Sequence, residues 1–252
     1  MHKLNLACRL FRIDSQSVVI IKKILEKKSK KSYLYEIYEE GTPQEQKLYF
    51  SVKNITKNKL GHLIEIYLDR LIFLPQRDIE SQPVKHTPTY FLQLLETPQK
   101  FKDHILIFGP QSIDAGIRRA FTRHVSKTQK VSTALIQRKV DFNKIKSLSL
   151  EFPNIQHFCV KDITDDRLQD IIVKGSRLED TVEYSQYAIN ELTKGEINIL
   201  GVSVKGKTIY IKKDGSFYSR HNFDKFDTSE VIFSLIERID KRKGFMASLD
   251  DF

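Results

Sequence analysis

Short runs of alternating apolar and polar residues, separated by turn-forming residues, constrain the fold more than any other feature of this sequence. The pattern is clearest near the C-terminus, where residues 197–205 and 208–212 alternate on either side of Gly206. Asp214-Gly215 then suits a tight turn into Phe217-Tyr218. Alternating runs joined by short turns predict antiparallel β-hairpins.

Similar runs occupy much of the remaining chain, and we expect mixed or mainly antiparallel sheets. Gly41 and Asn58 lie in turn-forming clusters between such runs. The expected strands are residues 4–13, 33–39, 48–52, 63–74, 90–95, 104–108, 155–160 and 170–174.

Apolar residues at helical spacing predict about four helices, at about residues 15–31, 112–130, 179–192 and 229–242. Together with the strands they indicate an α/β fold of the α+β type. Three prolines within residues 75–89 mark a linker or long loop. We therefore predict a sheet-rich N-terminal subdomain (1–80), an α/β domain with a basic helix and a C-terminal hairpin-helix unit (90–245), and a flexible tail (246–252).

Composition predicts a globular cytoplasmic protein. With 252 residues, 40% of them hydrophobic, the chain can bury a sizeable core. Only Cys8 and Cys159 are present, which excludes a disulfide scaffold and fits a reducing compartment. The N-terminus lacks the apolar region of a signal peptide, and no apolar run approaches the roughly 18–20 residues of a membrane span. We expect no membrane partner.

Positive charge is the main functional signal. Lys and Arg number 42 against 32 Asp and Glu, a net charge of +10 that favours polyanionic partners. Nine of these cations, against two Asp, lie in residues 112–146. A helical projection places Arg119, Arg123 and Lys130 along one side, with Lys127 beside them, and such a stripe can neutralise successive phosphates. We therefore predict a non-enzymatic component that binds DNA or RNA through Arg118, Arg119, Arg123, Lys127, Lys130, Arg138 and Lys139.

A protein partner is the first alternative. Residues 162–191 carry eight Asp and Glu against three Lys and Arg, so the basic helix has an internal acidic segment to pair with, or both segments serve charged protein partners. If both segments bind charged protein partners, the protein is a protein-interaction subunit of a larger complex. The last residues, which end in Asp250-Asp251-Phe252, are similar to the acidic tails of single-stranded-DNA-binding proteins. That resemblance implies a protein partner for the C-terminal tail.

A nuclease is the second alternative. Arg119 and His124 have the Arg-x4-His spacing that resembles the motif of the HEPN ribonucleases, in which a helix-borne Arg and His act on the RNA phosphodiester. The resemblance implies that Arg119 binds phosphate and that His124 is the acid or base. Ala120 replaces the polar residue that usually follows the Arg, and the flanking segments predict strands, whereas those enzymes are helical bundles.

Metal and cofactor motifs are incomplete. Asp162, Asp165, Asp166 and Asp170 lack the spacing of an EF-hand loop, and the Gly109-Pro110 turn lacks the Gly-Lys-Ser/Thr of a Walker loop. The histidines show no paired ligand spacing. We expect no metal, no cofactor and no catalytic residue.

Overall fold

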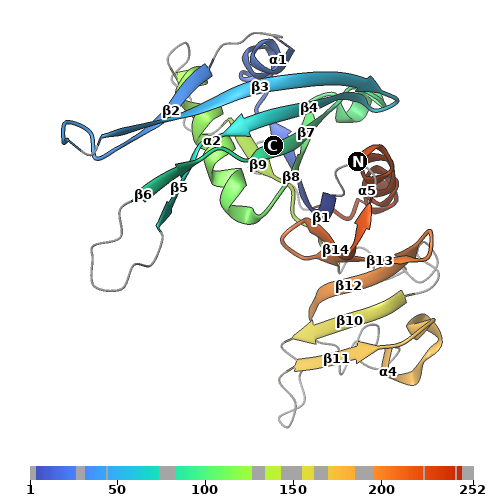
Figure 1. The fold of residues 1–252 in the computed structure, drawn as a ribbon. Helices are drawn as coiled ribbons and strands as arrows, with labels where there is room; N and C mark the ends of the chain where they lie inside the picture. Colours follow the sequence, from blue (N-terminus) through green and yellow to red (C-terminus); the bar gives the residue numbers. More distant parts are fainter. Residues whose placement is uncertain are drawn as a thin grey trace, which may run out of the picture. The chain divides into compact units, whose positions relative to one another are not determined.

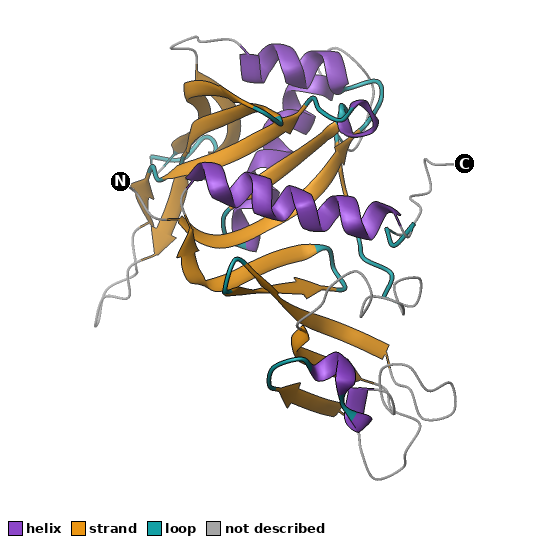
Figure 2. Ribbon diagram, turned by 90° about the vertical axis from the view of Figure 1, so that its right-hand side faces the viewer, coloured by secondary structure: helices purple, strands orange, loops and turns teal. Residues whose placement is uncertain are grey.

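The computed structural model describes most of the chain as two compact units. The described residues are 4–26, 32–43, 45–73, 83–126, 134–142, 155–161, 170–184, 196–223, 225–241 and 243–245. One unit comprises residues 11–136, and the other comprises residues 1–10 with residues 137–252. We call them the N-terminal unit and the C-terminal unit. Strands make up most of the secondary structure in both (Figures 1 and 2).

The N-terminal unit contains an antiparallel sheet in the order β8-β7-β4-β3-β2. Its hairpin between β3 and β4 has a two-residue connection, and Asn58 Oδ1 there accepts hydrogen bonds from the backbone N–H groups of Leu60 and Gly61. Local turn chemistry thus fixes the register of the longest pair. The strands are β2 (Ser32–Tyr38), β3 (Gln46–Asn58), β4 (Gly61–Leu68), β7 (Thr89–Leu95) and β8 (His104–Phe108).

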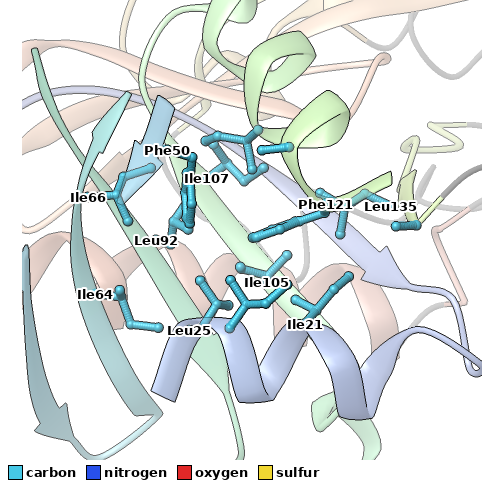
Figure 3. Packing of buried hydrophobic residues seen from close by; sticks show 14 of the residues in the cluster. Ile21, Leu25, Phe50, Ile64, Ile66, Leu92, Ile105, Ile107, Phe121 and Leu135 are labelled. Carbon is cyan, nitrogen blue, oxygen red and sulfur yellow. The ribbon is translucent and has the colours of Figure 1, made fainter. Parts of the chain in front are cut away.

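Two helices, α1 (Val18–Glu26) and α2 (Gln111–Ser126), complete the core of this unit. Figure 3 shows Ile21 and Leu25 of α1 near Ile105 of β8, with Phe121 of α2 entering the same cluster. Phe121 is fully buried and packs edge-on against Phe50, with 5.5 Å between the ring centroids. The apolar side of each helix therefore covers the sheet, as helical periodicity predicts.

The run at residues 63–74, expected as one strand, is two strands. β4 ends at Leu68, and β5 (Arg70–Phe73) pairs with β6 (Pro83–His86) in a separate two-stranded sheet. Asp69 causes the break, because its carboxylate accepts hydrogen bonds from the Tyr49 backbone N–H at 3.0 Å and the Thr87 hydroxyl at 2.8 Å. A buried carboxylate held in this way anchors a corner in the chain.

The C-terminal unit has an antiparallel sheet in the order β11-β10-β12-β13-β14, to which the first part of β1 (Leu4–Ile13) adds. The expected hairpin turn at Asp214-Gly215 is present, and Asp214 Oδ1 accepts hydrogen bonds from the Ser216 backbone N–H and hydroxyl. α5 (Lys225–Lys241) contacts β14. The strands are β10 (Ile155–Lys161), β11 (Asp170–Lys174), β12 (Glu196–Val204), β13 (Lys207–Lys212) and β14 (Ser216–Phe223), and a short β9 (Leu135–Gln137) pairs with β1.

The α+β class is confirmed, but the expectation of about four helices is wrong for the described residues, which contain three helices of at least nine residues. In place of the helix expected at 179–192, the chain forms a 3-10 turn (Leu178–Asp180) and a three-residue helix, α4 (Val182–Tyr184). Thr181 separates this turn from α4, because its backbone is extended. Its hydroxyl donates a hydrogen bond to the Leu178 carbonyl. Residues 185–195 lie outside the described part of the chain.

The two units do not coincide with the predicted division near residues 80–90. β4 and β7 pair along seven residues across that division, so the proline-containing segment is a connection inside the N-terminal unit. The proposed tail at 246–252 lies outside the described residues.

Candidate functional site

The predicted phosphate contacts fall into three groups in the structure. Arg118, Arg119 and Arg123 lie on α2 in the N-terminal unit. Arg138 and Lys139 follow β9 in the C-terminal unit. Lys127 and Lys130 lie outside the described residues.

The apolar side of α2 determines where its arginines point. Ile113, Ile117 and Phe121 are fully buried, whereas the Arg119 side chain is 56% exposed. A helix places residues two apart on different sides, so burial of Ile117 and Phe121 directs Arg119 away from the core. α2 packs beside β2 (Figure 1), and Arg119 therefore reaches the side chains of that strand.

A pocket of about 290 Å³ lies where α2 meets the strands of this unit. Gly116 permits the close approach, since a Cβ atom there would lie 2.9 Å from Leu68 Cδ2. Leu48, Leu68 and Leu71 supply apolar walls. The polar and aromatic lining consists of Tyr35, Glu36 and Tyr38 from β2, Arg70 from β5 and Arg119 from α2.

Arg119 forms an ion pair with Glu36 in the lining of this pocket. Arg119 Nη1 donates to Glu36 Oε1 at 2.8 Å, and the two side chains are 56% and 34% exposed. Exposed ion pairs of this kind contribute about 0–1 kcal/mol, because water and salt screen them. The carboxylate that Arg119 contacts is thus Glu36 of β2.

Arg70 is the second guanidinium in the pocket, and its position depends on the corner at Asp69. The Asp69 carboxylate is buried and also pairs with Lys85 Nζ at 2.7 Å. The Tyr35 hydroxyl donates to the Asp69 carbonyl, and Arg70 Nη1 donates to the Tyr90 hydroxyl at 3.3 Å. These bonds hold the start of β5 in place and so position Arg70 before any ligand binds.

Tyr35 lies within electrostatic range of both arginines. The pKa of its phenol is raised from 10.0 to about 12, mainly by burial and also by the Glu36 carboxylate, while Arg119 and Arg70 both act to lower it. Both arginines therefore lie close enough to Tyr35 to act on its ionisation. The lining of the pocket therefore combines two arginines, one glutamate and two tyrosines with three leucines.

The buried phenol gives a testable pH dependence. The folded-state pKa of Tyr35 exceeds the unfolded value, so its contribution to stability is fully present below pH 10 and is lost as the pH rises toward 12. Urea denaturation of wild type and Tyr35→Phe across this range measures the contribution. We expect the variant to lose about 1 kcal/mol at neutral pH with the hydroxyl hydrogen bond, and to show a shallower alkaline decline. Equal declines in the two proteins would contradict burial of the phenol.

The structure does not place Arg119 and His124 in one site. The His124 ring packs edge-on against the Tyr33 ring, with 4.8 Å between centroids, and the lining of the pocket includes Arg119 but not His124. Five residues along a helix turn the side chains about 140° apart, which explains the separation. His124 therefore packs between α2 and β2 and stabilises their interface.

Among the described residues, no group of three or more His, Cys, Asp and Glu is arranged to hold a metal ion. Asp162, Asp165 and Asp166 lie outside them. None of the helices in the described ranges is long and apolar enough to cross a membrane.

Sequence reasoning identified Arg119 but missed the other polar residues of the pocket, Glu36, Arg70, Tyr35 and Tyr38. One signal was present, since Asp69-Arg70 interrupts an otherwise apolar run and marks a break in the strand. The convergence itself has no local signal, because the residues lie up to 84 positions apart and meet only through strand pairing and helix packing. No protein-family model and no curated protein matches this chain.

Proposed function

We propose that the protein binds nucleic acid, and that Arg119 of α2 and Arg70 of β5 contact its phosphates. The observation that carries the proposal is the presence of both arginines in the lining of one pocket, together with one carboxylate residue, Glu36. A guanidinium group can donate two parallel hydrogen bonds to a phosphate, as it can to a carboxylate, and Arg119 Nη1 donates one to Glu36 Oε1. The net charge of +10 supports the same class of ligand.

Arg123, four residues beyond Arg119, adds positive charge on the same side of α2, and Arg118 adds positive charge about 100° around the helix. Both are half-buried, so their charged ends lie at the surface of the helix that carries Arg119. A strand of nucleic acid that follows α2 meets several cations in succession. Each neutralised phosphate releases counterions, so binding weakens steeply as salt rises.

The test is a salt titration of binding to single- and double-stranded DNA and RNA, with wild type, Arg119→Gln and Arg70→Gln. Each substitution is expected to reduce the slope of log affinity against log salt by about 0.7 for single strands or about 0.9 for B-DNA. Arg177→Gln is the matched control, because Arg177 is also exposed and paired with a carboxylate, Asp180, at 2.8 Å. It removes the same charge outside the pocket and should leave the slope unchanged.

If the slope fell equally in Arg119→Gln and Arg177→Gln, net charge alone would account for binding. That result would refute the assigned contacts. Absence of binding to all four nucleic acids at low salt, together with stable co-purification of a protein, would instead favour a protein-interaction subunit.

A further inference from the structure

We infer that the pocket of the N-terminal unit receives one nucleoside monophosphate group, either as a free nucleotide or as an unpaired nucleotide of a strand. This inference rests on the proposed function and specifies the ligand of the same site. The first reason is the volume of the pocket. At about 290 Å³ the pocket is close to the lower end of the range for small-molecule sites, about 300–1,000 Å³. A paired helix can touch only its rim, whereas one unpaired nucleotide can enter.

The lining contains both apolar side chains and cations, so it suits a ligand that has an apolar part and an anionic part. Leu48 and Leu68 are almost fully buried and, with Leu71, form apolar walls against which a planar base can pack. Tyr38 is half-buried and lines the pocket on the β2 side. Stacking of a base on an aromatic ring typically changes affinity by about 5- to 150-fold, with little preference among bases.

The two arginines assign the phosphate end. A phosphate that enters takes the place of the Glu36 carboxylate at Arg119 and receives Arg70 as a second donor. A nucleoside without phosphate leaves the Arg119–Glu36 pair intact and gains no charge contact. The pocket should therefore discriminate strongly between a nucleotide and its nucleoside, and Glu36→Gln should tighten nucleotide binding because it removes the competing carboxylate.

The absence of tryptophan from the chain provides a selective probe. Tyr38→Trp introduces the sole tryptophan, in an aromatic position in the pocket lining. Its fluorescence is titrated with a nucleoside monophosphate, the matching nucleoside, inorganic phosphate, a single-stranded oligonucleotide and a duplex. We expect saturable changes with the monophosphate and the single strand. The nucleoside and inorganic phosphate should bind at least about tenfold more weakly, and the duplex should bind without changing the signal.

Calorimetry of the unsubstituted protein with the same ligands guards against perturbation by the tryptophan. Leu71→Phe is a second variant that narrows the pocket and keeps both arginines. It should abolish nucleotide binding and preserve the salt-dependent binding of strands, which depends on the exposed guanidinium groups. Retention of full nucleotide affinity in Leu71→Phe would overturn the inference.

The outcomes separate this inference from the proposed function. If strands bind with the expected loss of salt slope in Arg119→Gln, but no mononucleotide binds by either method, the pocket inference fails and the proposed function stands. If a mononucleotide binds and no strand does, the pocket inference stands for a free nucleotide and the proposed function fails. Binding of neither overturns both.

Discussion

Gly215→Ala is expected to lower the free energy of unfolding by about 3 kcal/mol, whereas Gly41→Ala should lower it by about 1 kcal/mol. Both glycines have a φ of 81°, in the left-handed region where alanine is strained. Their surroundings differ. An added Cβ at Gly215 would lie 1.7 Å from the Arg138 carbonyl oxygen, and at Gly41 it would meet no atom within 4 Å.

The Arg138 carbonyl cannot easily move aside, which is why the clash should be costly. The Arg138 N–H donates to the Leu10 carbonyl at 2.9 Å, and the Val140 N–H donates to the Lys213 carbonyl at 3.0 Å. Displacement of this segment would break backbone hydrogen bonds on both sides of the clash. Urea denaturation of the two variants and wild type measures the difference. Equal losses in the free energy of unfolding would show that the segment around Arg138 moves aside without destabilising the protein.

Phe121→Ala is expected to lower the free energy of unfolding by about 3–5 kcal/mol. The ring is fully buried between α2 and the sheet (Figure 3), and its removal leaves a cavity lined by the remaining core side chains. The edge-on contact with Phe50 at 5.5 Å is lost as well. Chemical denaturation followed by circular dichroism gives the value.

Phe121→Leu is the matched control, because it keeps most of the volume and should cost less than about 1.5 kcal/mol. The pair also tests how the pocket depends on packing. Phe121 lies two residues beyond Arg119, so the alanine variant should weaken phosphate binding as α2 loosens, and the leucine variant should not. A loss below 1 kcal/mol in Phe121→Ala would contradict the dense packing of this core.

The sequence by itself determined most of the strands, because a half-buried sheet needs alternating side chains and its turns need particular residues. Residues 4–13 and 104–108 are predicted as strands and correspond to β1 and β8, and Asp214-Gly215 forms the expected turn. These features depend on residues close together in the chain, so the sequence is sufficient to predict them. The helix expected at about residues 15–31 corresponds to α1, which begins at Val18 after a turn in which the Ser17 hydroxyl donates to Asp14, and residues 27–31 lie outside the described part of the chain.

Only the tertiary structure decided the division into units and the composition of the pocket. Both depend on contacts between residues far apart in the chain: β4 pairs with β7 across the prolines, and Glu36, Arg70 and Arg119 meet from three elements. The sequence showed that the segment at 112–130 is basic, and folding placed Arg119 beside Glu36. The charge pattern along the chain therefore suggested the class of ligand that we propose, whereas the residues of the proposed binding site became known only from tertiary contacts.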